Sequence, residues 1–144
     1  MFTLEELQED ILAFLKDLVP WTVVEGGVPD IAKLPKTSSG KIKPYVVVSF
    51  GDVTPNGRHA MSGAFDDDYR ISVYVTTIGP DAETARKVNN QVTLGFLGRT
   101  FDWAGQVRKL GGGGMYTAVA STSATEAYAF PSIYSINIQL AETP

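Results

Sequence analysis

The chain has 144 residues, of which 12 are basic and 16 acidic, so its formal net charge is −4. This length predicts a single domain over residues 1–144, because two half-length domains would each be small for an independent core. The absence of cysteine excludes disulfides, thiol nucleophiles and cysteine-based metal sites, and an acidic chain is a poor general binder of nucleic acid.

The N-terminal segment has the pattern of an amphipathic helix. Thr3 and Glu6 match a capping box, in which each side chain accepts a hydrogen bond from a backbone N–H of the first turn. Apolar residues recur at helical spacing as far as Leu18, and Pro20 follows, so we predict a helix over residues 4–18. The acidic start is unlike a signal peptide, and no 18-residue apolar run occurs, so we expect no membrane association.

Three segments in the first half of the chain have the composition of β-strands. Residues 21–24 form a short candidate, and residues 45–50 are a β-branched run typical of a central strand. Residues 69–76 alternate, so that the apolar positions from Ile71 to Val75 face one way and the intervening side chains face the other. This alternation predicts a strand with one buried face.

A second helix follows the third strand. Asp81 is its expected N-cap, and Gly98 is placed to end it. We assign its apolar stripe to Ala82, Ala85, Val88, Val92, Phe96 and Leu97.

The C-terminal third predicts shorter strands near residues 106–110 and 116–120, with a turn-like stretch over residues 121–127. In the final strand we expect Ile136, Ile138 and Leu140 to point inward and the polar residues between them to point outward. The whole pattern predicts an α+β fold, with an antiparallel or mixed sheet, two helices packed on one face and long loops between strands.

Two long polar loops, residues 25–44 and 51–67, carry the residues that we consider candidates for an interface. Loops of this length are usually functional or disordered. A run of like charges is most often a solvated surface, and a contact with an acidic partner is the alternative. The candidates are the four lysines of the first loop, three charged residues of the second and the acid that directly follows it: Lys33, Lys36, Lys41, Lys43, Arg58, Asp66, Asp67 and Asp68.

No motif for chemistry stands out. The glycines at 111–114 are followed by Met115 and Tyr116, whereas a phosphate-binding loop needs Lys and then Ser or Thr. Three successive acids at 66–68 point in alternating directions and do not form a cation cage. His59, the only histidine, has no evident nucleophile or oxyanion hole to serve. We therefore expect no cofactor, no metal and no catalytic residue.

Four stretches together are similar to a known family. They are the opening helix ending at Leu18-Val19-Pro20, the strand of residues 43–48 with Gly51-Asp52, the strand-to-helix passage of residues 69–79 and 85–92, and the final strand of residues 134–140. In these stretches the chain resembles the tail terminator, or tail completion, proteins of long-tailed bacteriophages, especially those of actinobacterial phages.

The resemblance implies a structural virion protein rather than an enzyme. Such proteins are α+β domains that form a ring, usually a hexamer, on the head-proximal end of the tail tube, after assembly in the host cytoplasm. The implied partners are further copies of the chain, the tail tube protein and a head–tail connector protein, with DNA only passing through the lumen. The alternatives are another connector or a tail tube subunit, and a small monomeric ligand-binding domain.

Overall fold

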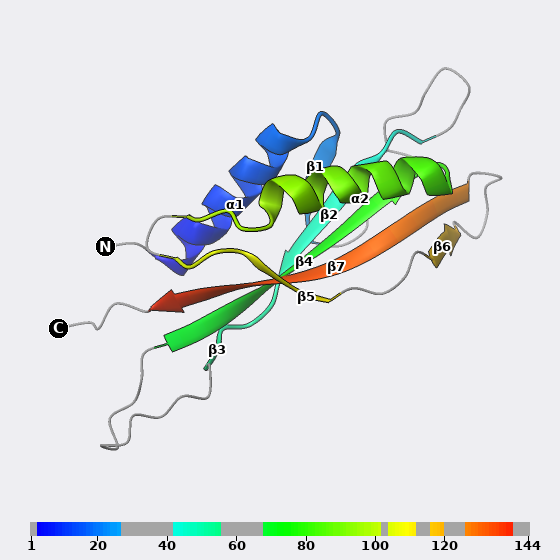
Figure 1. Cartoon of the computed structure of the whole chain (residues 1–144). Helices are drawn as coiled ribbons and strands as arrows, with labels where there is room; N and C mark the ends of the chain where they lie inside the picture. The colour runs from blue at the N-terminus through cyan, green and yellow to red at the C-terminus, as the bar shows by residue number, and fades with distance from the viewer. Residues whose placement is uncertain are drawn as a thin grey trace, which may run out of the picture.

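A computed structural model describes residues 3–26, 42–55, 68–101, 104–111, 116–119 and 126–139 (Figure 1). Its elements in chain order are α1 (Leu4–Leu18), β1 (Thr22–Glu25), β2 (Tyr45–Phe50), β3 (Thr54–Pro55), β4 (Asp68–Gly79), α2 (Ala82–Phe96), β5 (Arg108–Gly111), β6 (Tyr116–Val119) and β7 (Glu126–Gln139).

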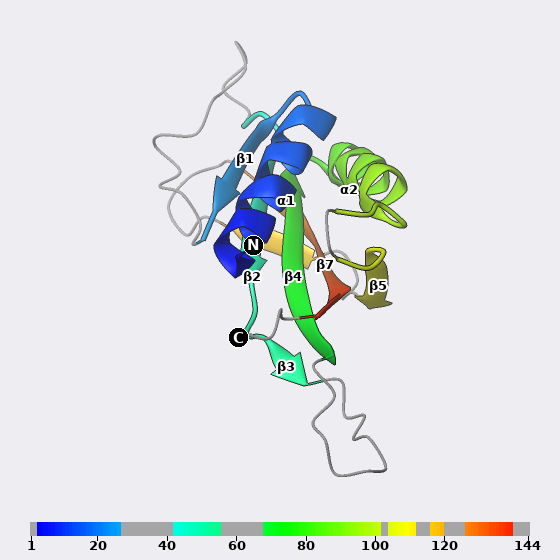
Figure 2. The ribbon, with the colours of Figure 1, turned by 90° about the vertical axis from the view of Figure 1, so that its left-hand side faces the viewer.

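The strands form one mixed sheet with both helices on the same face (Figure 2). The main path runs β1-β2-β4-β7-β5, in which β1 is parallel to β2 and the other neighbours are antiparallel. β3 pairs with one end of β4, and β6 pairs with one end of β7. The predicted α+β class, with two helices packed against a mixed sheet, is confirmed.

Helix α1 begins and ends where the sequence predicts. The Glu6 backbone N–H donates to Thr3 Oγ1 at 3.2 Å, and the Thr3 N–H donates to Glu6 Oε2 at 3.3 Å, which completes the capping box. Leu7, Ile11 and Leu15 are the buried residues of its inner face. The four-residue and three-residue spacing of the apolar side chains therefore produces one continuous buried stripe.

Helix α2 is capped as expected, with Asp81 Oδ1 accepting from the Thr84 N–H at 2.7 Å. Gly98, at φ +79°, follows the C-cap residue Leu97, so the predicted end is also confirmed. Leu97 itself does not belong to the buried stripe, because its side chain is 46% exposed. As the C-cap it has extended backbone angles and leaves the helical periodicity.

The main core lies between the two helices and the inner face of the sheet. The predicted inward residues of β4 are fully buried there, as are Ile136 and Ile138 of the final strand and alternate residues of β2. The buried residues of these strands are Val46, Val48, Ile71, Val73, Val75, Tyr134, Ile136 and Ile138. Leu140, the third inward residue predicted for the final strand, lies outside the described residues. The two helices approach closely where Gly95 faces Leu18, and a Cβ at position 95 would overlap the Leu18 side chain.

Strands β3 and β7 differ from the sequence prediction. The loop expected over residues 51–67 contains the short strand β3, and β7 begins at Glu126, within the stretch predicted to be turn-like. Pro131 falls inside β7, where a proline normally argues against a strand. It lies between the part of β7 paired with β6, ending at Ala129, and the part paired with β5, beginning at Ile133, so neither of these described pairings needs an N–H from residue 131.

The outer face of the sheet is less polar than its alternating sequence suggests. Tyr45 and Ile78, which oppose each other on β2 and β4, are buried there with Ile42 and Ala129. Tyr74, further along the same face of β4, is 42% exposed. One end of the outer face therefore has a second, smaller apolar cluster, while its middle remains open.

Substituting Val92 by Asp tests the assignment of the α2 core face. Val92 is 1% exposed, and an unpaired carboxylate in that position is expected to lower stability by about 4 kcal/mol or more. The matched control is Leu94→Asp, two residues away and 84% exposed, which is expected to change stability by less than about 0.5 kcal/mol. Urea denaturation measures both, and equal stability of the two variants would contradict the assignment.

Candidate functional site

A small group of polar side chains is buried between α2 and β7. The Ser132 hydroxyl donates to Asn89 Oδ1 at 3.2 Å, and the hydroxyls of Thr93 and Tyr134 lie 3.0 Å apart. Burial raises the pKa of the Tyr134 phenol above its ordinary value, while hydrogen bonds with Thr93 and Ser132 act in the opposite direction. These groups include no carboxylate or cation, so we assign them to helix–sheet packing rather than to chemistry.

The described part of the chain holds no group of three or more His, Cys, Asp or Glu residues that could bind a metal ion. A wide, shallow depression lies beside α1, lined by Ala13, Phe14, Lys16 and Asp17. Within the same ranges, no helix is long and apolar enough to span a bilayer.

Most of the predicted interface residues lie outside the described residues: Lys33, Lys36, Lys41, Arg58, Asp66 and Asp67. The single histidine, His59, lies outside them as well. The two interface residues that remain are not brought together. Lys43 is exposed two residues before Tyr45, which pairs with Ile78 near one end of β4. Asp68 is the first residue of β4, at the other end of the 12-residue strand. They are therefore separated by nearly the length of β4, roughly 30 Å, and cannot belong to one compact contact.

An aromatic cluster joins the two helices and was not predicted from the sequence. The Phe14 ring stacks on Phe96 at 6.1 Å and meets the edge of Phe101 at 5.7 Å between centroids. The Arg99 guanidinium carbon lies 4.7 Å from the centroid of Phe14. Arg99 is exposed, so this cation–π contact closes the cluster against solvent at the junction of the helices.

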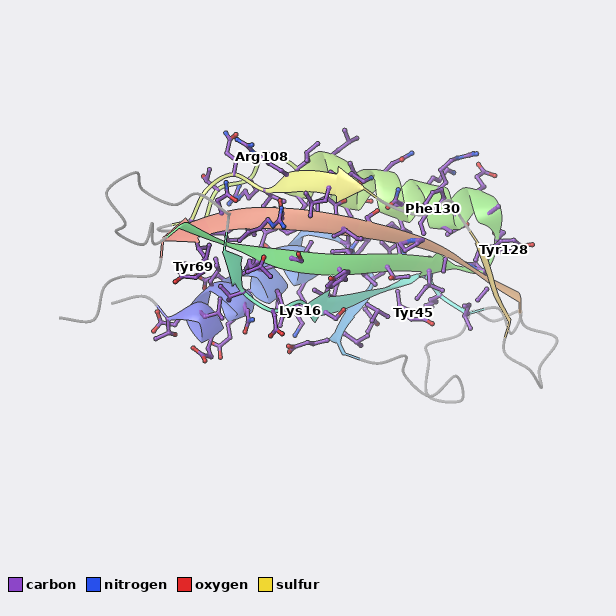
Figure 3. The ribbon with its side chains drawn as sticks, turned by 90° about the horizontal axis from the view of Figure 1, so that it is seen from below. Lys16, Tyr45, Tyr69, Arg108, Tyr128 and Phe130 are labelled. Atoms are coloured by element: carbon purple, nitrogen blue, oxygen red, sulfur yellow. The ribbon has the colours of Figure 1, made fainter. Side chains whose placement is uncertain are left out.

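Charge is distributed unequally across the fold. The solvent face of α1 carries exposed carboxylates at Glu5, Glu9, Asp10 and Asp17. The edge strand β5 carries exposed bases at positions 108 and 109. Figure 3 shows Arg108 at one margin of the sheet and oxygen-tipped side chains of α1 at the opposite margin. The acids of α1 are evident in the sequence, but their position opposite β5 depends on the order of the strands.

Comparison of the chain with protein-family models finds no match, and comparison with curated proteins also finds none. The class of this protein is given by its fold alone, which is an α+β fold with a helix-covered mixed sheet.

Replacing Tyr134 by Phe tests the effect of the buried phenol on stability at high pH. Because the pKa of Tyr134 is raised in the folded state, its favourable contribution is complete below the unfolded pKa of about 10 and is lost as pH rises through the folded pKa. The variant should lose less stability than the wild type above pH ~10, although at neutral pH it loses about 1 kcal/mol from the unpaired Thr93 hydroxyl.

The measurement is urea denaturation across an alkaline pH series, compared by slope rather than by absolute stability. Tyr74→Phe, on the open middle of the outer face, is the control and should retain the wild-type slope. A Tyr134→Phe slope equal to that of the wild type would mean that this phenol does not contribute to alkaline unfolding.

Proposed function

We propose that this chain is a subunit of a ring that terminates the tail of a long-tailed bacteriophage. What carries the proposal is the resemblance described above, whose four stretches coincide with core elements: α1, β2, the β4–α2 passage and the end of β7. These are the elements that set the helix-covered sheet, so the resemblance follows the framework of the fold rather than an isolated motif.

In this function the protein acts by recognition and is not an enzyme. The ring covers the last layer of tail tube protein, which removes the surface to which another tube subunit would add. Its opposite face then offers a docking surface to a head–tail connector protein, and DNA passes through the lumen. The protein would lie at the head-proximal end of the virion tail after assembly in the host cytoplasm, and it requires no cofactor.

A closed ring requires complementary contact surfaces on each subunit. The contact is heterologous, so two different patches of the chain must fit each other, and a constant rotation must close the circle. The fold offers two different sheet margins, β1 and β5, each paired on one side within the described residues. Two dissimilar margins are compatible with a head-to-tail contact.

The experiment that tests this function is native mass measured across a concentration series, with negative-stain images of the same samples. A closed ring of about six subunits supports the proposal. Long tubes would instead identify a tail tube subunit. A protein that stays monomeric and also fails to bind the ends of isolated tail tubes would overturn the proposal.

Neutralising the lysine loop tests its predicted role in assembly. Changing Lys33, Lys36, Lys41 and Lys43 to Gln should preserve the thermal unfolding transition and reduce assembly, because the loop loses its attraction for an acidic partner. A control with Arg86 and Lys87 changed to Gln removes exposed charges from α2 and should assemble normally. Undiminished assembly of the loop variant would remove the loop from the interface.

A further inference from the structure

The solvent face of α1 is an acidic surface, which we define by Glu5, Glu9, Asp10 and Asp17. All four carboxylates are exposed, and Lys16 is the only base on the helix. In the described part of the chain, none of the four forms an ion pair; the ion pair seen there joins Lys87 and Glu83 on α2. Among these residues the four carboxylates are therefore available to a partner, while the Arg99 guanidinium lies against the same helix, over Phe14.

The edge strand β5 forms a basic margin, which we define by Arg108, Lys109 and Leu110. Both cations are exposed, and Leu110 is 51% exposed beside them. The Lys109 ammonium lies 5.9 Å from the centroid of the buried Tyr134 ring, which helps to hold it at the sheet margin. Within the described ranges β5 pairs with β7 alone, and the preceding residue, Val107, is hydrogen-bonded to Gly98 and Arg99.

These two surfaces lie on opposite sides of one subunit. α1 packs beside β1, and β5 is the last strand on the path β1-β2-β4-β7-β5. Four strand spacings, roughly 19 Å, separate β1 from β5 across the sheet. Among the described residues no ion pair joins the two surfaces of one subunit, so the basic margin remains available to the acidic surface of a second copy.

We propose that the basic β5 margin of one copy docks on the acidic α1 surface of the next copy, which makes this head-to-tail pair the subunit contact of the assembly. The inference rests on the proposed ring and specifies which surfaces form it. Repetition of one such contact, with constant rotation, generates a closed ring.

Charge also selects this orientation over the two symmetric alternatives. A two-fold contact through α1 would bring carboxylates against carboxylates, and one through β5 would bring cations against cations. Like charges facing each other are strongly unfavourable, whereas the head-to-tail pair places opposite charges together. Leu110, which is 51% exposed, adds an apolar contact that does not depend on salt.

Charge reversal on each surface separately, and then on both, tests the contact. The basic-margin variant is Arg108→Glu with Lys109→Glu, and the acidic-surface variant is Glu9→Lys with Asp10→Lys. Sedimentation velocity in low salt should show each variant assembling at least about tenfold more weakly than the wild type. The chain carrying all four changes again has complementary surfaces and should recover assembly, which a merely misfolded variant would not do.

The matched control is Arg86→Glu with Lys87→Glu, which changes the net charge by the same amount as the basic-margin variant. Both residues are exposed on α2 and belong to neither surface of the proposed contact, so assembly should not weaken. Circular dichroism checks that each variant is folded. Raising the salt from about 10 mM to 1 M, which shortens the screening length from roughly 30 Å to 3 Å, should shift the wild type toward smaller species.

The outcomes separate this contact from the proposed function. Rings that persist in both reversal variants would overturn the contact and leave the ring function standing. A wild type that remains monomeric in low salt would also overturn the contact, because attraction is then strongest, and the function would be judged by binding to tail tubes. If the basic-margin variant still forms rings but loses binding to duplex DNA, the basic margin binds nucleic acid and the proposed contact is wrong.

Discussion

The structure depends on the antiparallel pairing of β4 with β7. The pairing runs from Asp68 opposite Gln139 to Gly79 opposite Tyr128, the length of β4. Strands β2 and β3 add to β4, while β5 and β6 add to β7. The inner faces of the two central strands also supply the surface on which α2 packs. The position of α2, the two margins of the sheet and the core therefore all depend on this one strand pair.

The helices were predictable because their ends are encoded locally. Thr3 and Glu6 define one start, Asp81 defines the other, and Gly98 marks an end, so no distant contact is needed to place them. The buried face of β4 was also predictable, since its alternation has a period that only a strand satisfies. Local chemistry and burial agree in these elements, and the prediction succeeds.

The first half of strand β7 could not be predicted from the sequence. Its first half contains Pro131 and several small or aromatic residues, so neither composition nor alternation indicates a strand. From Tyr128 onward it is paired with β4, and a partner strand that is distant in the sequence leaves no local trace. The candidate interface also depends on contacts that are distant in the sequence. The carboxylates of α1 are visible in the sequence, but their position on the other side of the sheet from Arg108 depends on the order of the strands. The pairing of Phe14 with Arg99 likewise requires the two helices to be side by side.

Pro131 has a consequence for the hydrogen bonding of the central strand pair. It opposes Thr76 of β4, and because a proline has no backbone N–H, this residue inside β7 contributes an acceptor but no donor. A proline inside a strand also disfavours the addition of a further strand at that position, because an added neighbour would find one donor fewer.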